Sequence, residues 1–480
     1  MIGDIAKCSY LLYSLYRLSK SETEGNMKRV KDAAYVCGAV GVKLIQFLVM
    51  REAFGSSVRE EFSDFFDDCV VHPWHRTASM YKDKFKRNIE DDYRVNLRHP
   101  IGSGSMGQVY RMYSYALKRD VAVKVKHPNT DRDVRVFIDN VNRVFKLFNK
   151  LSLFPMYDLI DEFMRNIVTQ LDYRTEAENM RKMKTNFSGE ERVVIPEVFD
   201  ANDTFLIMDY IPSTPMTQLK NERLKASVCL DISFIVLKSL MLHDFVHCDL
   251  HYGNWGIANI DDIYKQQRRQ SDGKDVEMFT NDYRIVLYDF GIMGSTGSMQ
   301  RCRDIMDAFY LGNLDKMCRL MVKGYDEHPR YHEMQQLLKD MPNTIYTERY
   351  SIAMNRAIKL GMQFDHDVMR CLHGLIMCER IFKEGFAAIK DALVDTTNPR
   401  DKFCLSLCYQ HGILTRWTDR YQDLRQEFAK WIESEPWVTE RFGEWLMDNF
   451  GHDDMEVFLD VIMKCLDCTQ NSKNDSDMLM

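Results

Sequence analysis

The sequence predicts an α+β protein of two lobes, a small β-rich lobe followed by a large helical lobe, with a helical extension in front of them. Apolar residues recur at helical spacing from residue 1 to about residue 92. From about residue 95 to residue 211, short β-rich runs are interspersed with helical stretches. After IPSTP (211–215) helical spacing returns and continues almost to the end. With 480 residues the chain is too long for one small core, so several packed units are expected.

The expected elements follow in chain order. The helical extension is assigned to residues 1–94 and the β-rich lobe to residues 95–211. In that lobe we expect strands at 100–113, 120–127, 193–199 and 204–211, and helices at 131–150 and 156–183. The helical lobe is assigned to residues 212–466, with strands at 254–260 and 283–294 and an exposed charged loop, 260–282, between them. Residues 467–480 are polar and are expected to be disordered.

The overall charge and the cysteine content narrow the class of protein. A formal net charge of −7 and a pI near 6.0 argue against a dedicated nucleic-acid binder, which needs a basic face. The 13 cysteines are scattered along the chain, which favours free thiols in a reducing intracellular compartment, without deciding between cytoplasm and mitochondria. The apolar segment 35–50 is too short for a membrane span and contains Lys43. Peripheral contact with a membrane surface stays compatible with the sequence.

A glycine-rich segment, GSGSMGQV, opens the β-rich lobe. Glycines let the backbone turn closely over a ligand and aim its N–H groups at phosphate oxygens. A plain hairpin turn is the alternative. A dinucleotide-binding loop runs directly into a helix, whereas this segment joins two expected strands, as the loop over ATP does in kinases. The residues expected to contact nucleotide are Gly102, Ser103, Gly104, Gly107 and Val109.

A lysine on the next strand is the expected ligand of the phosphates. In VAVKVKH, Lys124 occupies the position of the lysine in the VAVK-type kinase strand, but Lys126 shares its face and a solvated edge lysine is the alternative. Such a lysine needs a carboxylate to fix it. Glu176, in the helical segment LDYRTEAENM, is the expected partner of Lys124. Asp172 lies one helical turn earlier, so a solvated acidic face is the alternative there.

The segment HCDLHYGN (247–254) places polar residues between two apolar runs. H-x-D-x-x-x-x-N is the spacing of a kinase catalytic loop. Asp249 is expected to accept or orient the proton of the attacking hydroxyl, and Asn254 to offer a neutral oxygen to Mg²⁺, while His247 supports the loop. The strand VLYDFGIMG then places Asp289 as the second metal ligand. Mg²⁺ prefers hard oxygen ligands and shares them with substrate phosphates.

ATP and Mg²⁺ are therefore the expected cofactors. The break between the lobes is the expected position of the adenine base, which backbone groups from Asp209 to Ile211 would bind. Most of the rate enhancement in such sites comes from positioning and charge neutralisation, so each of these residues is expected to matter.

These motifs resemble those of the UbiB (AarF-domain) atypical kinases over about residues 33–330. VAVKVKHP is similar to the family's VAVKVQHP, LDYRTEAEN to LDFxxEAxN, and HCDLHYGN to HADxHPGN. KLIQFLVMRE resembles the KxGQ motif, with Lys43 and Gln46 in the motif positions. The resemblance implies a bilobal protein-kinase-like fold. It also implies a KxGQ helix over the active site, which brings Lys43 close to the metal-binding carboxylates as part of the catalytic set.

The chain departs from that family at several motif positions. The family's loop over the phosphates is usually alanine-rich, whereas this one has the full glycine set. Ile45 replaces the glycine of KxGQ, a larger side chain that changes how closely that helix can pack. Gln170 replaces the glutamate of the ExD motif, whose aspartate is kept as Asp172, so one negative charge is missing near the implied second metal site.

Residues and resemblance together predict Mg²⁺-dependent ATP hydrolysis or phosphoryl transfer to an unidentified acceptor, which could be a protein, a lipid or a quinone-pathway metabolite. The resemblance implies a link to lipid-quinone (coenzyme Q) metabolism, with ATPase activity more readily than protein phosphorylation. Two alternatives stay open: a nucleotide-gated pseudokinase scaffold, and a kinase of small molecules or lipids. The joint presence of Lys124, Asp249, Asn254 and Asp289 argues against the scaffold.

Overall fold

The structure is a computed structural model. It describes most of residues 2–340, with residues 51–70 and 220–242 described only in part, gaps at 149–155, 259–282 and 311–312 and a few single positions, and parts of residues 352–381. The expected disordered tail at 467–480 and the later part of the helical lobe lie outside the described residues. None of the described helices is long and apolar enough to cross a membrane.

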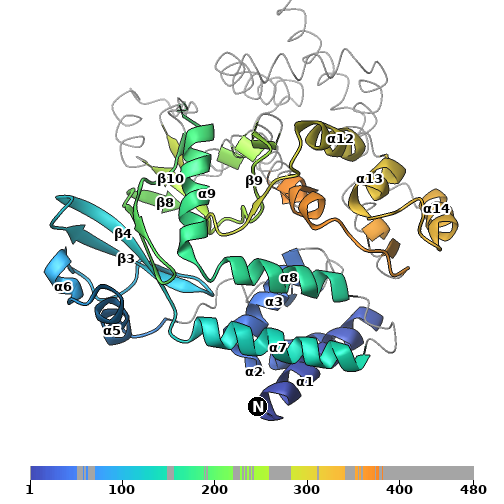
Figure 1. The fold of residues 1–480 in the computed structure, drawn as a ribbon, viewed down its shortest axis with the longest axis horizontal. Coiled ribbons are helices and arrows are strands. Elements are labelled where there is room, and N and C mark those ends of the chain that lie inside the picture. The colour runs from blue at the N-terminus through green and yellow to red at the C-terminus, as the bar shows by residue number, and fades with distance from the viewer. Residues whose placement is uncertain are drawn as a thin grey trace, which may run out of the picture.

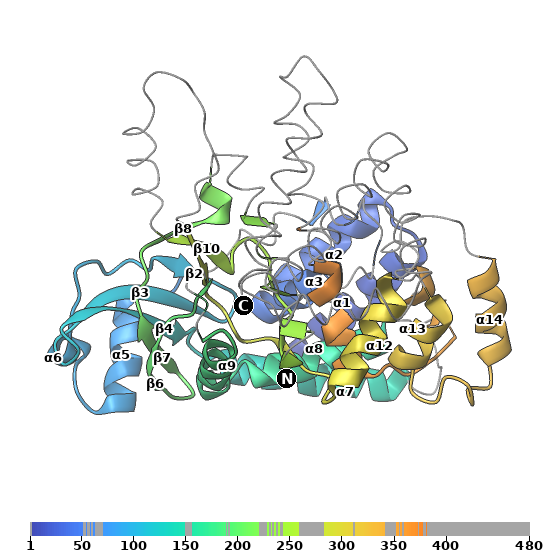
Figure 2. The same ribbon diagram turned by 90° about the horizontal axis from the view of Figure 1, so that it is seen from above.

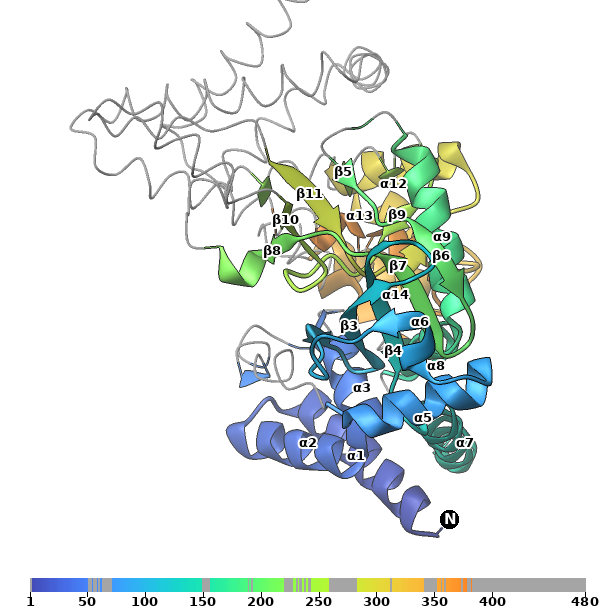
Figure 3. The same ribbon diagram turned by 90° about the vertical axis from the view of Figure 1, so that its left-hand side faces the viewer.

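The helical extension is not a separate unit, because it shares a core with helices of the β-rich lobe. Its helices are α1 (Ile2–Lys20), α2 (Glu24–Val36) and α3 (Gly38–Met50). They pack beside α7 (Thr130–Phe148) and α8 (Tyr157–Thr169), as the clustering of these helices in Figures 1 and 3 shows. Leu11 and Leu15 of α1, Leu44 and Leu48 of α3 and Phe163 of α8 are all buried in this common core.

The β-rich lobe is built on an antiparallel sheet whose strands run in the order β1-β3-β4-β7-β6, with β2 paired to β3. The strands are β1 (Tyr93–Arg94), β2 (Gly102–Ser103), β3 (Gly107–Ser114), β4 (Arg119–Lys126), β6 (Val198–Ala201) and β7 (Phe205–Asp209). Since strand side chains alternate between the two faces, the valines of β4 point to one face of the sheet, whereas Ala122, Lys124 and Lys126 point to the other.

One face of this sheet is covered by α5 (Trp74–Phe85), which Figure 2 shows lying against the strands, and by the short α6 (Ile89–Asp92). Val121 and Val123 of β4 pack there with Tyr81 of α5. On the opposite face Ala122 packs with Ala177 of α9 (Tyr173–Asn186). By this alternation Lys124 and Lys126 share the face of Ala122, as the sequence predicts.

Two smaller sheets lie beside the first among the described residues (Figure 1). One has the order β5-β11-β10-β8, and another pairs β12 with β9. The strands are β5 (Val193–Val194), β8 (Ser213–Pro215), β9 (Val246–His247), β10 (Trp255–Ala258), β11 (Arg284–Leu287) and β12 (Met293–Gly294). A 3-10 turn, η2 (Met216–Gln218), follows β8, and the helices α12 (Met299–Tyr310), α13 (Leu314–Met321) and α14 (Tyr331–Lys339) follow the sheets.

Two expected elements are divided in the structure. The single strand expected at 193–199 is wrong, because β5 pairs in parallel with β11 whereas β6 pairs with β7 in the other sheet. Pro196 lies between them and has no backbone N–H to continue a ladder. The helix expected at 156–183 is the pair α8 and α9, since Asp172 caps α9 by accepting from the backbone N–H of Arg174 at 3.0 Å. The overall α+β architecture with a β-rich and a helical lobe is confirmed.

Candidate functional site

The glycine-rich segment forms the turn between β2 and β3, so the predicted strand-to-strand loop is present. Gly104 N–H donates to the carbonyl of Gly107 at 2.8 Å and closes the turn. Val109 pairs with Gly102 on one side and with Lys124 on the other. Gly107 is required for a steric reason, because an added Cβ would collide with the Tyr173 hydroxyl and the Val125 carbonyl.

A chain of neutral polar groups supports this turn from behind. His127 Nε2 lies 2.8 Å from the carbonyl of Gly104 and must donate to it, so in a neutral imidazole Nδ1 accepts. His72 Nδ1, at 2.8 Å, is then the donor to His127, and His72 Nε2 accepts from the Thr77 hydroxyl at 2.8 Å. Burial lowers the pKa of His127, and burial followed by the charge of His127 lowers the pKa of His72 to about 4, which keeps both rings neutral.

Lys124 joins the two lobes through carboxylates. Its Nζ lies 2.7 and 2.8 Å from the oxygens of Glu176 on α9 and 3.0 Å from Asp289 Oδ2, just after β11. The predicted ion pair of Lys124 with Glu176 is therefore present. Glu176 is 5% exposed and Lys124 is 12% exposed, whereas the Asp289 side chain is 41% exposed and can meet a ligand.

Their pKa values follow from burial and mutual charge. Burial alone would lower the pKa of Lys124, but Asp289 and Glu176 outweigh it and raise that pKa above its ordinary value. Burial raises the pKa of Glu176 to about 7 against the opposing charge of Lys124. Desolvation acts to raise the pKa of Asp289, but Lys124 and the Gly291 amide hold it below its usual range. Lys124 and Asp289 are thus the permanently charged members of the group.

The segment 247–254 forms a loop that is hydrogen-bonded to the start of the segment Asp289–Phe290–Gly291, called DFG below. Asp249 N–H donates to His247 Nδ1 at 3.2 Å, so His247 carries its proton on Nε2 and donates it to the carbonyl of Asp289. Tyr288 N–H donates to the carbonyl of Asn254 at 2.9 Å. Asn254 Nδ2 in turn donates to the carbonyl of Asp249 at 2.7 Å. These bonds bring Asp249, Asn254 and Asp289 together as predicted.

The oxygens of this group fit Mg²⁺. The amide nitrogen of Asn254 donates to Asp249, so Oδ1 of Asn254 is the side-chain atom that can accept a ligand. Asp249 Oδ1 is buried and has no hydrogen-bond partner among the described residues. With the exposed carboxylate of Asp289, the donor set is all oxygen and carries negative charge, which is the set that Mg²⁺ prefers. Asn254 and Asp289 would hold the ion, and it would neutralise charge on phosphate oxygens.

Lys43 reaches the same place from the helical extension. Its Nζ donates to the Ser105 hydroxyl at the tip of the glycine turn, at 3.0 Å. Its charge also contributes, after larger effects, to the lowered pKa of Asp289. Lys43 is therefore close to a predicted metal-binding carboxylate, as the KxGQ resemblance implies, and it contacts the turn as well. Ile45 beside it is fully buried in the core that α3 shares with α8.

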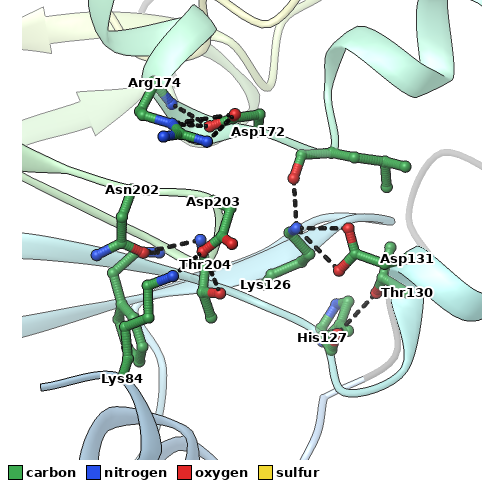
Figure 4. Close-up of polar contacts among 12 residues, drawn as sticks. Lys84, Lys126, His127, Thr130, Asp131, Asp172, Arg174, Asn202, Asp203 and Thr204 are labelled. Carbon is green, nitrogen blue, oxygen red and sulfur yellow. Dashed lines mark hydrogen bonds and ion pairs between the residues drawn. The ribbon is translucent and has the colours of Figure 1, made fainter.

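Gln170 and Asp172, the two residues of the ExD-like segment, have different partners. Gln170 is next to the DFG glycine, since a Cβ on Gly291 would stand 3.4 Å from Gln170 Cγ. Asp172 instead binds the guanidinium of Arg174 at 2.6 to 3.0 Å (Figure 4). Because Gln170 is uncharged, the described geometry gives no carboxylate from this segment to the site beside Gly291.

The expected adenine hinge shows engaged backbone groups. Asp209 N–H donates to the carbonyl of Glu197 at 2.8 Å, and the carboxylate of Asp209 lies 3.5 Å from Arg119. The carbonyl of Ile211 accepts from the Ser213 hydroxyl at 3.1 Å. Adenine binding by residues 209–211 stays a prediction, and the amide of Asp209 is already used.

Several residues that the sequence reasoning did not select hold this site in place. Asn179 Nδ2 donates to the carbonyl of Phe290 at 2.8 Å and so ties α9 to the DFG segment. Asp244, at φ +42°, accepts from Thr296 N–H at 2.6 Å and from the Ser295 hydroxyl at 2.9 Å. It thus fixes the start of the loop 247–254 to the segment after Gly291. Asn179 lies in the EAEN motif, so a signal existed, whereas Asp244 has none.

Lys126, the alternative to Lys124, has a different set of partners. Figure 4 shows it pointing to Asp131, at the start of α7, and its Nζ lies 3.0 Å from both carboxylate oxygens. It also donates to the carbonyl of Leu171, between α8 and α9. Its side chain is 3% exposed. Lys126 therefore joins parts of the β-rich lobe to each other, and the choice of Lys124 as the lysine between the lobes agrees with the geometry.

Comparison with known proteins gives this arrangement its family. The sequence profile described as "ABC1 atypical kinase-like domain" matches residues 50–321. The chain is 25% identical over 288 residues, 58% of its length, to Protein ACTIVITY OF BC1 COMPLEX KINASE 3, chloroplastic, from Arabidopsis thaliana, covering 37% of that protein. It is 26% identical over 192 residues, 38% of its length, to AarF domain-containing protein kinase 1 from Xenopus laevis, covering 36% of that protein.

The chain therefore spans little more than a third of the length of these two relatives. Among solved structures, the Rv3197–erythromycin complex from Mycobacterium tuberculosis is similar with a TM-score of 0.41 and 16% identity, over 66% of this chain and 86% of that one. That score is too low to support an argument about the fold. The family profile covers more than half of the 480 residues, including the glycine turn, Lys124, Asp249 and Asp289. The chain belongs to the ABC1 atypical kinase-like family, which confirms the resemblance drawn from its motifs.

Proposed function

We propose that the protein binds ATP with Mg²⁺ and either hydrolyses it or transfers its terminal phosphoryl group. The observation that carries the proposal is the contact of Lys124 with both Glu176 and Asp289. One cation held between a helix of one lobe and the DFG segment of the other is the arrangement needed to orient phosphates. Lys126, which has a structural role, instead finds both of its partners within one lobe.

The remaining roles follow from position. The glycine turn would cover the phosphates with its backbone N–H groups. Asp249 would accept or orient the proton of the attacking hydroxyl or water, for which its unpartnered Oδ1 is suited. His247 positions Asp249 through the bond to its backbone N–H. Mg²⁺ bound by Asn254 and Asp289 would supply charge neutralisation at the phosphates.

The choice between a protein acceptor and a smaller one turns on α3. Because Lys43 contacts Ser105 at the tip of the turn, the helix that carries it limits access to the phosphates from that side. This favours water or a small acceptor, such as a lipid or a quinone-pathway metabolite, over an extended protein segment. A link to coenzyme Q metabolism rests on the family resemblance alone and is proposed on that basis, as is contact with a membrane surface.

The test is turnover of radiolabelled ATP by the wild type beside Asp289→Asn. The substitution keeps the size of the side chain but removes the charge that Lys124 and the metal ion need, so hydrolysis should fall at least about 100-fold. Asp340→Asn, at the end of α14, is the matched control and should match the wild type. Equal background rates in all of them would instead favour a nucleotide-gated scaffold without catalysis.

A kinase of lipids or other small molecules is the second candidate, favoured by the same α3 contact. Anionic lipid vesicles, detergent micelles and quinone-like phenols are added separately to the ATPase assay. A rise in rate with phenols but not with vesicles would indicate a small aromatic acceptor or activator. A rise with vesicles of phosphatidylglycerol alone would indicate a membrane surface. No change with any of them would leave ATP hydrolysis as the activity to explain.

A further inference from the structure

Tyr173 lies inside the phosphate-binding part of the site without a role in the scheme above. It is the first residue of α9, one turn before Glu176, and it is 2% exposed. Its hydroxyl lies against Gly107 so closely that no side chain fits there. Lys124 Nζ stands 5.3 Å from the centre of its ring. The side chain therefore occupies the space between the glycine turn and the lysine expected to hold phosphates.

The hydroxyl of Tyr173 is buried and has no hydrogen-bond partner among the described residues. A buried donor left without an acceptor destabilises the fold, so its retention needs an explanation. Packing does not supply one, because the motif that this segment resembles, LDFxxEAxN, has Phe where Tyr173 stands and would fill the same volume. The hydroxyl is an addition at this position, and it faces the ligand side of the sheet.

The surroundings indicate what kind of acceptor would suit it. Burial raises the pKa of Tyr173 above its ordinary value, so the hydroxyl keeps its proton and can only donate or accept as a neutral group. Among its charged neighbours the cation Lys124 acts most strongly on this hydroxyl and favours an anion there, while the carboxylates Glu176 and Asp289 each act more weakly in the opposite direction. An oxygen that is negatively charged and reaches under the glycine turn satisfies both conditions.

We propose that the Tyr173 hydroxyl donates a hydrogen bond to a phosphate oxygen of the bound nucleotide, next to the oxygens held by Lys124. Tyr173 is then a phosphate-binding residue that raises the affinity of the site for nucleotides and not for nucleosides. Gly107 is needed to admit this hydroxyl beneath the turn, in addition to any contact of its own with the ligand. The inference deepens the proposed function and rests on it, since it requires that an adenine nucleotide binds at this site.

The experiment compares the wild type with Tyr173→Phe by isothermal titration and thermal unfolding, using adenosine, ADP and ATP with Mg²⁺. Loss of a hydrogen bond to a charged oxygen should weaken ADP and ATP binding about tenfold or more and leave adenosine binding unchanged. The nucleotide-free Tm should stay the same or rise, because an unpartnered hydroxyl is removed. Tyr81→Phe is the matched control, since Tyr81 is equally buried on the other face of the sheet and bonded to Asp92 at 2.5 Å. It should lower the nucleotide-free Tm and leave every affinity unchanged.

The other outcomes each overturn the inference in a recognisable way. If Tyr173→Phe behaves like Tyr81→Phe, with a lower Tm and unchanged ADP affinity, the hydroxyl has a structural partner such as the Val125 carbonyl. If adenosine and ADP weaken equally, Tyr173 shapes the pocket without contacting phosphate. If the wild type binds neither ADP nor ATP, the proposed function fails as well. If the wild type and Tyr173→Phe bind both nucleotides equally tightly, only the role of Tyr173 fails and the proposed function stands.

Discussion

Lys124 and Lys126 leave the same face of β4, are both largely buried and both meet carboxylates, yet their surroundings differ in kind. Lys126 has two partners, Asp131 and Leu171, and both belong to the same lobe as Lys126. Its contacts therefore stay within that lobe. Lys124 instead bridges Glu176 in one lobe and Asp289 in the other. A lysine whose partners all lie in one lobe stabilises that lobe, whereas a lysine that bridges the two lobes at a predicted metal-binding carboxylate is placed to serve a ligand.

The largest expected effect is that of Lys124→Met on turnover. ATP hydrolysis should fall at least about 100-fold, because the phosphates lose their buried cation, and the ADP-dependent rise in Tm should disappear. The nucleotide-free Tm should change little, since burial already raises the pKa of Glu176 to about 7 and that carboxyl can take up a proton. A Lys126→Met variant with the same loss of turnover and an unchanged Tm would reverse the assignment of the two lysines.

Lys126→Met should show the opposite pattern. It leaves the Leu171 carbonyl without its donor, which should cost about 1–3 kcal/mol in the free energy of unfolding. ADP affinity, measured well below the melting temperature, should stay within about twofold of the wild type. Urea denaturation gives the first quantity and titration calorimetry the second. An unchanged free energy of unfolding would show that the contacts of Lys126 add nothing to stability.

Lys43→Ala tests a third lysine, which comes from outside the β-rich lobe. Removing its bond to Ser105 should free the glycine turn and raise autophosphorylation, or shift the preference between ADP and ATP, at least about fivefold. Incorporation of radiolabelled phosphate and nucleotide titration measure the two effects. Lys28→Ala, on the exposed side of α2, is the control. Identical behaviour of both variants would mean that the α3 contact does not restrain the turn.

The smallest expected effect concerns His72, which supports the glycine turn from the other face. Its pKa of about 4 in the fold lies below the ordinary 6.5, so below pH 6.5 the unfolded chain takes up a proton that the folded chain does not. The free energy of unfolding should therefore lose about 2 kcal/mol as the pH falls from about 6.5 to about 4. The raised pKa of Glu176 acts in the opposite direction over an overlapping range, so the measured quantity is the difference between wild type and His72→Gln.

That difference is obtained by urea denaturation at pH 7.5 and pH 5. His332→Gln, an exposed histidine on α14, should retain the wild-type dependence on pH. If His72→Gln keeps the full loss of stability toward pH 5, the neutral pair of His72 with His127 does not contribute to the acid sensitivity of the fold.

The motifs predicted what is local and left out what depends on distant contacts. The spacing of HCDLHYGN and DFG was sufficient to group Asp249, Asn254 and Asp289, since hydrogen bonds join the loop 247–254 to Tyr288 and Asp289. The pattern VAVKVKH could not by itself separate Lys124 from Lys126, because alternation puts both on one face and only their partners differ. Their roles in binding nucleotide stay predictions.

Other features had no sequence signal of their own. His72 and His127 are 55 residues apart in the sequence, so neither periodicity nor spacing indicates that they pair. The apolar pattern of residues 193–199 does not indicate that the segment divides into β5 and β6, although the missing N–H of Pro196 is a physical reason for the break. The contact of Lys43 with Ser105 followed from the family resemblance only in outline, as closeness to the site.

The core that α1 and α3 share with α8 has a consequence for anyone who shortens this protein. Removing the residues before the first strand would remove the leucines of α1 and α3 and expose the apolar surface of the remaining helices to solvent. Such a fragment should aggregate rather than act as an unrestrained enzyme. Any restraint that α3 places on the glycine turn through Lys43 should therefore be relieved by a shift of these helices and not by their removal.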